Sequence, residues 1–420
     1  MLYERWQRIA RDNQNLIALT DFSTDRRWTF AELAATADSI SPDATPIQFP
    51  QGAGAGFILD VLKAWRSGAV VCPLESGQSV PVIAHPPEGI VHLKTTSATT
   101  GAARLVTFTA EQLAADADNI VQTMGLRQDW PNLGVISLAH SYGFSNLVTP
   151  LLLHGIPLAL VNSPLPEALR RAAALVSDAT LPAVPAMWRL WHEADAIPEN
   201  IRLAISAGAP LPLPLEDAVF QKAGLKIHNF YGATECGGIA YDCSSTPRTF
   251  ASCVGGPMKN VNLSVNDEGC LEVRGAAVGQ SYWPEPGLNL EAGGYRTADL
   301  VEVKDGEVFL RGRASDQINV AGRKVSPETI ERVLQTHPQV RECLVFGAPS
   351  SGAERAEIVV ACVAANDGTN SEILKQYLLT QLPAWQVPRE WRFVDSLAPN
   401  QRGKLSRAEW RARLGFTSPT

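Results

Sequence analysis

Short runs of β-branched and apolar residues alternate along the chain with runs whose apolar residues recur at helical spacing. After Pro164, the apolar residues between Leu165 and Leu175 fall on one face of a helix. Candidate strands follow at residues 201–206 and 225–229, and each leads directly into a turn that contains glycine. The alternation predicts layered α/β structure. Because open α/β sheets bind ligands beyond the carboxyl ends of their strands, both turns are candidate site segments.

The pattern changes after about residue 255, where short alternating strands replace the helical runs. Residues 301–304 and 307–310 flank Asp305-Gly306. An Asp-Gly pair between two alternating runs is a strong signal for a two-residue hairpin turn. We therefore predict a β-rich subdomain in this part of the chain.

A length of 420 residues is too great for one ordinary domain. A helix opening at Ser326-Pro327, followed by apolar strands at residues 341–346 and 358–363, marks a separate final part. We predict an α/β fold whose large N-terminal domain, residues 1–313, combines layered α/β subdomains with the β-rich subdomain. A small α/β C-terminal domain, residues 314–420, is expected to follow it.

The composition is that of a globular protein without a nucleic-acid surface or a membrane span. Hydrophobic residues make up 45%, charged residues 19%, and the net charge is −7. The most apolar stretch, residues 146–161, is interrupted by prolines and too short to span a membrane, and the first residues lack a secretory signal. Seven cysteines without a C-x-x-C pair favour reduced thiols and a cytoplasmic location.

A hydroxyl-rich segment, TTSATTGAAR at residues 95–104, follows a short apolar run. Hydroxyl and backbone N–H groups in such a loop can donate to phosphate oxygens, and the guanidinium of Arg104 can bind them bidentately. The segment is not a Walker loop, because G-x-x-x-x-G-K-[ST] is absent. From these residues alone, a phosphate loop and a polar surface turn are equally good interpretations.

The segment resembles the phosphate loop of the adenylate-forming (AMP-binding) superfamily, which includes acyl- and aryl-CoA synthetases and the adenylation domains of peptide synthetases. The usual form there is T-S-G-T-T-G-x-P-K-G. The chain keeps Thr96, Ser97, Thr99, Thr100 and Gly101. It has Ala98, Ala103, Arg104 and Leu105 where the superfamily has Gly, Pro, Lys and Gly. The resemblance implies that Thr99, Thr100 and Arg104 act on the ATP phosphates and that Thr96, Ser97 and Gly101 help to bind the nucleotide.

The two turns after the candidate strands also resemble superfamily motifs. Ser206-Ala207-Gly208-Ala209-Pro210 would let a flat base lie against the backbone, and residues 229–235 (NFYGATE) resemble N-x-Y-G-x-T-E. The resemblance implies that Tyr231 stacks on adenine, that Asn229 reads the adenine edge and that Thr234 meets the α-phosphate. Glu235 would be catalytic by holding Mg²⁺, a hard cation that prefers carboxylate ligands. The backbone of the nucleotide site would include Gly208, Ala209 and Gly232.

Three later segments complete the resemblance. Residues 295–299 (YRTAD) resemble Y-[RK]-T-G-D, in which Asp299 would accept both ribose hydroxyls. The segment that begins at Gly312-Arg313 resembles the interdomain hinge motif; Arg313 would contact ribose or phosphate, and Ser315 would be the hinge of a mobile C-terminal domain. Residues 399–407 (PNQRGKLSR) resemble the loop whose lysine, here Lys404, bridges the α-phosphate and the substrate carboxylate.

Candidate pocket residues come from His140-Ser141-Tyr142-Gly143-Phe144, where the superfamily lines its acyl pocket. We expect His140 and Tyr142 to contact the substrate, with further pocket wall from Trp188 and Ala207. For His140 the alternative is a core histidine whose hydrogen bonds are satisfied. The aspartate that pairs with an amino-acid substrate in peptide synthetases is absent here. Aryl and fatty acids therefore both remain open.

The resemblance implies an enzyme that joins a carboxylic acid to a thiol at the expense of ATP. The acid would attack MgATP to give acyl-AMP and pyrophosphate, and the thiol of CoA or of a phosphopantetheine arm would then take the acyl group. Two alternatives remain: an adenylating enzyme that loads a carrier protein, and a non-catalytic nucleotide-binding relative, which the altered phosphate loop suggests.

Two further features qualify the resemblance. Only residues 75–95 separate Leu74 from Thr96, so we expect an abbreviated first subdomain. Gly52-Ala53-Gly54-Ala55-Gly56 resembles a dinucleotide fingerprint, but Phe57 stands where G-x-G-x-x-G needs its third glycine. We therefore reject a dinucleotide-binding dehydrogenase.

Overall fold

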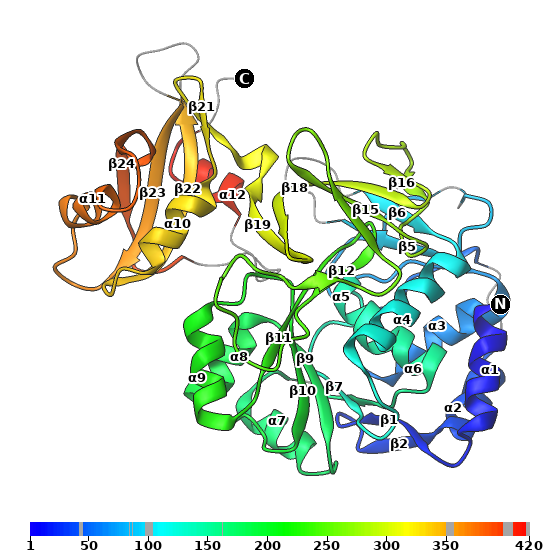
Figure 1. Cartoon of the computed structure of the whole chain (residues 1–420). Helices are drawn as coiled ribbons and strands as arrows, with labels where there is room; N and C mark the ends of the chain where they lie inside the picture. The colour runs from blue at the N-terminus through cyan, green and yellow to red at the C-terminus, as the bar shows by residue number, and fades with distance from the viewer. Residues whose placement is uncertain are drawn as a thin grey trace.

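The computed structural model describes residues 1–41, 45–83, 85, 87–96, 104–161, 163–349, 357–397 and 406–416. Within these residues the chain forms several sheets with helices packed around them (Figure 1). The predicted α/β class is confirmed.

The largest sheet carries the two turns that the sequence singles out. Neighbouring strands are parallel in its centre, and antiparallel strands lie at both edges. In spatial order the strands are β13 (Gly256–Pro257), β12 (Gly237–Tyr241), β11 (Ile227–Ala233), β10 (Ile201–Ser206), β9 (Ala179–Ala183), β7 (Asn132–Gly134), β8 (Leu158–Leu160), β1 (Ile17–Asp21) and β2 (Arg26–Thr29).

Local signals in the sequence fix the ends of the helices around this sheet. Thr29 and Thr109 each form a capping box at a helix start. Gly125 and Gly224 end two helices in the left-handed conformation, with φ of 67° and 63°. The helices are α1 (Leu2–Asp12), α2 (Phe30–Ser39), α3 (Ala55–Ser67), α4 (Ala110–Met124), α5 (Ser141–Gly143), a π-helical turn (Phe144–Val148), α6 (Thr149–His154), α7 (Pro166–Ala173), α8 (Pro185–Glu193) and α9 (Leu213–Ala223).

A second sheet pairs strands that are far apart in the sequence. Its order is β16 (Ser281–Trp283), β6 (Leu105–Phe108), β5 (His92–Thr95), β4 (Val70–Val71) and β3 (Ile47–Gln48). In this sheet Tyr282 lies opposite Val106, antiparallel. The strand that follows the phosphate-loop segment is thus completed by residues from much later in the chain.

The predicted β-rich part forms a third sheet, and the Asp305-Gly306 hairpin is confirmed. Asp305 and Gly306 both have positive φ, 53° and 81°, as a two-residue turn of this kind requires. The strands are β14 (Asn262–Val265), β15 (Cys270–Arg274), β18 (Gly294–Lys304) and β17 (Leu290–Glu291), and β19 (Glu307–Arg313) pairs with β18.

The residues after β19 form a smaller lobe, coloured yellow to red in Figure 1. A core of its own, which includes Ile330, Val345, Val363 and Leu374, lies between its helices and strands. The elements are a 3₁₀ turn (Ala314–Asp316), β20 (Ile318–Val320), β21 (Arg323–Val325), α10 (Pro327–Gln335), β22 (Val340–Pro349), β23 (Glu357–Ala365), α11 (Ser371–Leu379), a 3₁₀ turn (Ala384–Gln386), β24 (Glu390–Phe393) and α12 (Arg407–Arg413). The fold thus has the predicted large N-terminal and small C-terminal parts.

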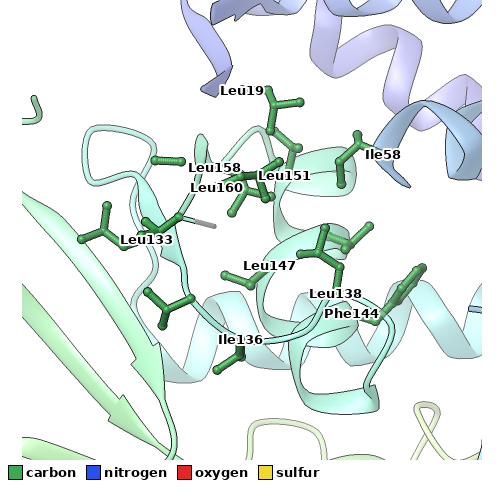
Figure 2. Close-up of a cluster of buried hydrophobic side chains, with 14 of the residues drawn as sticks. Leu19, Ile58, Leu133, Ile136, Leu138, Phe144, Leu147, Leu151, Leu158 and Leu160 are labelled. Atoms are coloured by element: carbon green, nitrogen blue, oxygen red, sulfur yellow. The ribbon is translucent and has the colours of Figure 1, made fainter. Parts of the chain in front are cut away.

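The main hydrophobic core lies where β1, β7 and β8 meet the π-helical turn and α6. Figure 2 shows Leu19, Leu151 and Leu158 gathered together, with Phe144 beside Leu138 in the same core. Each of these side chains is at most 1% exposed. This packing anchors the segment that begins at His140, because Phe144 lies only one turn beyond it.

The glycine-rich run at residues 52–56 leads into α3, and a carboxylate of the chain itself lies at the start of this helix. The Asp21 carboxylate accepts a hydrogen bond of 2.9 Å from the backbone N–H of Ala55. Burial alone would raise the pKa of Asp21, yet hydrogen bonds from Ser23 and Ala55 outweigh burial and lower it. The carboxylate of the protein itself therefore occupies the position that a dinucleotide pyrophosphate would need.

A buried network of two cations and two carboxylates lies at the start of β11 and contacts the chain just after the turn that follows β10. Lys226 lies 2.6 Å from Asp242 and also contacts Glu216, and Arg248 donates to Glu216 at 2.9 Å. These four side chains are at most 6% exposed. Arg248 also donates to the carbonyl of Leu211 at 2.8 Å, directly after the first turn. The two positive charges balance the two negative ones, and this pairing offsets the cost of burying them.

Removing one member of this network should destabilise the fold strongly. We expect Lys226→Met to lower the free energy of unfolding by about 3–5 kcal/mol, because Asp242 would remain buried without a cation and Glu216 would keep only Arg248. Lys222→Met is the matched control, since the Lys222 side chain is 49% exposed where it pairs with Asp195, and a loss below about 1 kcal/mol is expected there. Urea denaturation measures both; equal losses would contradict the prediction.

Candidate active site

The turn after β10 lies beside β11, which continues as a strand to Ala233 through most of the second predicted turn. The two strands are parallel neighbours, with Ser206 opposite Asn229. Gly208 has φ of +85°, a conformation that favours glycine, and the N–H of Ala207 donates to the Ala183 carbonyl at 3.2 Å. The small residues Ala207 and Gly208 therefore border the segment that carries Tyr231, as the sequence predicts for a flat ligand.

Asp299 joins three of the sequence motifs at one point. Its Oδ2 accepts a hydrogen bond of 2.5 Å from the hydroxyl of Tyr231, and its Oδ1 accepts one of 2.8 Å from Nε of Arg313. Asp299 and Arg313 are cross-strand partners in the β18–β19 hairpin. The structure thus brings together residues that are up to 82 positions apart (231 to 313).

The electrostatics of this cluster favour a protonated tyrosine and a charged arginine. Burial, and then the Asp299 charge, raise the pKa of Tyr231. The same carboxylate raises the pKa of Arg313. Each carboxylate oxygen can accept a second hydrogen bond, so Asp299 still offers acceptors to two adjacent hydroxyl groups.

Glu235 forms a second centre with a residue that sequence reasoning missed. The hydroxyl of Tyr282, in β16, donates to Oε1 of Glu235 at 2.9 Å. The guanidinium carbon of Arg104 lies 5.5 Å from the centre of the Tyr282 ring, within cation–π range. Burial and then the Glu235 charge raise the pKa of Tyr282, so the phenol remains a donor. No local motif marks Tyr282, because only the long-range pairing of β16 with β6 places it here.

The ends of the phosphate-loop segment are tied together. The backbone N–H and the hydroxyl of Thr96 both donate to the carbonyl of Arg104, at 2.9 and 3.1 Å. Four predicted loop residues, Ser97, Thr99, Thr100 and Gly101, and also Lys404, lie outside the described residues.

Asp116 fixes the chain that directly follows Glu235. This buried carboxylate accepts hydrogen bonds from Ser145 at 2.6 Å and from the N–H of Gly238 at 3.2 Å, and it lies 3.6 Å from Lys94 Nζ. A Cβ on Gly237 would lie 2.0 Å from the Asp116 carboxylate. Only glycine therefore fits at position 237. Through Asp116, Lys94 and Gly238, the elements α4, β5 and β12 meet at one charged contact beside Glu235.

Gly232 is also fixed by space, because a Cβ there would lie 2.6 Å from the carbonyl oxygen of Gly237. Thr234 and Glu235 follow it and are half-buried. Ser315 is exposed in the 3₁₀ turn after β19, where its hydroxyl donates to Asp316 at 3.1 Å. Gly232, Thr234 and Glu235 thus follow Tyr231 closely in the chain, and Ser315 follows Arg313.

The predicted pocket residues divide into two groups. His140 is exposed, which excludes a core position, and its Nδ1 accepts the N–H of Tyr142 at 3.2 Å. The Tyr142 ring lies 5.9 Å from Phe230, and its hydroxyl donates to the Ala183 carbonyl at 3.4 Å. Trp188 instead lies fully inside the core. Its indole N–H donates to the Ile205 carbonyl at 3.3 Å, so its side chain forms no pocket wall in this structure.

None of the helices in the described part of the chain combines the length and apolar character that a membrane crossing requires. Within the same residues, no group of three or more His, Cys, Asp or Glu side chains is arranged to hold a metal ion.

Comparison with known protein families agrees with this geometry. Residues 57–283 match the family described as AMP-binding enzyme, and residues 329–404 match the AMP-binding enzyme C-terminal domain. The chain therefore belongs to the AMP-binding enzyme family.

Relatives with assigned names include acid–thiol ligases. A probable 2-succinylbenzoate–CoA ligase of Mycobacterium tuberculosis is 30% identical over 342 residues, which cover 75% of this chain and 82% of the relative. The fatty acid–[acyl-carrier-protein] ligase ScoC of Streptomyces coeruleorubidus is 32% identical over 275 residues, 59% of this chain and 52% of that protein. The crystal structure of ATP-bound MatB from Rhodopseudomonas palustris shares the fold, with a TM-score of 0.86 and 19% identity over 98% of this chain and 99% of that one.

Replacing Asp299 should weaken nucleotide binding. Asp299→Asn removes the charge that pairs with Arg313 and offers one acceptor oxygen instead of two. Because a hydrogen bond to a charged group contributes about 1.5–3 kcal/mol, we expect AMP to bind about 10–100-fold more weakly in isothermal titration calorimetry. Asp305→Asn, at the turn of the same hairpin, should leave AMP binding unchanged; a similar loss in both variants would contradict the prediction.

Proposed function

We propose that this AMP-forming acid–thiol ligase joins an aryl or fatty acid to the thiol of CoA in two steps. A carboxylate oxygen of the acid first bonds to the α-phosphorus of ATP, and the bond to the β-phosphate oxygen breaks, releasing pyrophosphate. The thiolate of CoA then attacks the acyl carbon of the resulting acyl-AMP, and AMP leaves. The convergence of Tyr231, four positions before Glu235 in the chain, and Arg313 on Asp299 is the observation that carries this proposal.

In this proposal the Asp299 cluster binds the nucleoside. Asp299 accepts the two ribose hydroxyls, and Arg313, already hydrogen-bonded to it, contacts ribose or phosphate. The Tyr231 ring, in β11, stacks on adenine beside the turn after β10, where Gly208 and Ala209 leave room for a flat ring. Asn229, buried in the same strand, reads the adenine edge.

The phosphates would be held by the phosphate-loop residues, Thr234 and Arg104. Glu235 fits a Mg²⁺ ion as a single carboxylate ligand, because Mg²⁺ in such sites takes one or two carboxylates together with phosphate oxygens and water. Tyr282 holds one oxygen of Glu235 by its hydrogen bond and leaves the other available. When bound, the ion would neutralise phosphate charge as pyrophosphate leaves.

Lys404 would stabilise the charge that develops between the α-phosphate and the acid carboxylate. Lys404 must lie near the α-phosphate for the first step, whereas the thiol needs open access to the acyl-AMP for the second. We propose that residues 314–420 act as a mobile domain that rotates about Ser315 between the two steps. The exposed position of Ser315, next to the turn after β19, supports this role.

For the acid, we propose a site near Tyr142 and Ala207 with His140 at its entrance. No acidic side chain occupies residues 140–144, which supports acids without an amino group. The similarity to a 2-succinylbenzoate–CoA ligase supports an aryl acid and CoA. The similarity to a fatty acid–[acyl-carrier-protein] ligase supports a second candidate, a fatty acid loaded onto a carrier protein.

Pyrophosphate exchange tests the first step. The purified chain is incubated with MgATP, labelled pyrophosphate and one acid at a time: benzoate, 2-succinylbenzoate, malonate, octanoate or hexadecanoate. We expect label to enter ATP with one class of acid, and Lys404→Ala to reduce this exchange about 100–1,000-fold. Binding of ATP without exchange for any of these acids would instead indicate a non-catalytic nucleotide-binding relative. Thioester formation with CoA alone then separates CoA from a carrier protein as the acceptor.

Removing the hydroxyl of Tyr282 tests the Glu235 centre. Tyr282→Phe keeps the ring beneath Arg104 but leaves the Glu235 carboxylate without its donor. Loss of a hydrogen bond to a charged group, about 1.5–3 kcal/mol, should lower kcat/KM for MgATP about 10–100-fold and raise the Mg²⁺ concentration needed for half-maximal exchange. Tyr377→Phe, which removes a hydroxyl from α11, is the control; an unchanged Mg²⁺ requirement in Tyr282→Phe would contradict the assignment.

A further inference from the structure

Arg407, the first residue of α12, is surrounded by three carboxylates from two other elements. Its Nη1 donates to Asp316 at 2.8 Å, and its Nη2 lies 2.8 Å from Glu328 and 2.9 Å from Glu331. Its Nε donates to the carbonyl of Val345 at 2.9 Å. The guanidinium therefore connects α12 with the 3₁₀ turn after β19, with α10 and with β22.

The shape of the arginine side chain is essential to this contact. Each of its three nitrogens has a different partner, which a planar fork can satisfy and a lysine ammonium cannot. The Arg407 side chain is 22% exposed and that of Glu331 only 13%. Burial alone would lower the pKa of Arg407, but the surrounding carboxylates outweigh burial and raise it. Three acids facing one cation would repel one another if the guanidinium were absent.

The same cluster contacts the end of β19. Glu328 accepts a hydrogen bond from Ser326, and both side chains pack against Gly312. A Cβ at Gly312 would lie 2.0 Å from the Ser326 hydroxyl, and φ at Gly312 is +130°. Asp316 ends the turn that begins directly after Arg313. Arg407 therefore links the start of α12 to the chain on either side of Ser315.

We propose that Arg407 is a positioning residue, which fixes the C-terminal end of the segment carrying Lys404 to the acid cluster of Asp316, Glu328 and Glu331. This inference rests on the proposed role of Lys404, which precedes Arg407 by three positions in the sequence (404 to 407). Arg407 touches no reactant; it limits the positions that Lys404 can adopt relative to the hinge. Its loss should therefore impair the adenylation step and spare the thioester step, in which Lys404 has no part.

The experiment measures the two half-reactions separately. Pyrophosphate exchange reports adenylation with the acid that exchanges best, and thioester formation is followed from CoA and the prepared acyl-adenylate of that acid. We expect Arg407→Ala to lower kcat for exchange about 100-fold, as for a misplaced catalytic group, with KM for ATP and the thioester rate within twofold of the parent values. Arg407→Lys should be impaired to a similar degree. Arg413→Ala, at the other end of α12 where Arg413 lies over Trp410, is the matched control and should be unchanged.

Hydrogen exchange gives a second readout that does not depend on activity. Arg407→Ala should lose amide protection in α12, while α11 in the same lobe stays protected. If Arg407→Ala does not fold, Asp316→Asn removes one partner only and should lower exchange about tenfold with the same sparing of the thioester step.

The outcomes separate this inference from the proposed function. Equal loss of both half-reactions in the folded variants, or full exchange activity in Arg407→Ala, would overturn the positioning role. Full exchange activity in Lys404→Ala would overturn the proposed role of Lys404 itself. Loss of exchange in both Lys404→Ala and Arg407→Ala, with the thioester step preserved, would support both.

Discussion

The carboxylate of Asp299 accepts one donor from the largest sheet and one from the β18–β19 hairpin. Tyr231 belongs to β11 and Arg313 to β19, so two separately built sheets meet at a single acceptor group. Hydrogen bonds to a charged acceptor are short and directional, and they tolerate little displacement of either partner. The nucleoside site that we propose depends on this contact, since its base-binding and ribose-binding residues come from different sheets.

Steric contacts, as well as charges, restrict the backbone conformation near this site. Gly232 and Gly237 flank Glu235 at positions where any side chain would strike a backbone carbonyl or the buried Asp116 carboxylate. Asp116 is in turn held by Ser145 and Lys94. The half-buried Glu235 thus projects from a segment whose backbone has few alternatives, which suits a carboxylate that must hold a cation in a set position.

Local patterns in the sequence predicted the α/β layers and the β-rich part correctly. The Asp305-Gly306 turn could be read because two adjacent residues with positive φ determine it. The sequence motifs also indicated that Tyr231, Asp299 and Arg313 would converge, and the structure brings them together.

Residues whose position depends on distant pairing could not be found in this way. Tyr282 reaches Glu235 only because β16 pairs with β6, and Arg248 reaches Leu211 across a buried charge network. Trp188 shows the opposite error: its sequence position suggested a pocket wall, but the indole is fully buried and bonded to Ile205. A single aromatic residue on a helix carries no signal that distinguishes these two environments.

The pairing of β16 with β6 also bears on how the protein is made. A ribosome delivers residues 105–108 long before residues 281–283. Until then β6, whose four residues are all buried in the finished fold, is an edge strand. Exposed edges of this kind attract other chains. Shortened products that stop before β16 would therefore be prone to aggregate. We expect chaperones to bind the nascent chain until Tyr282 has left the ribosome.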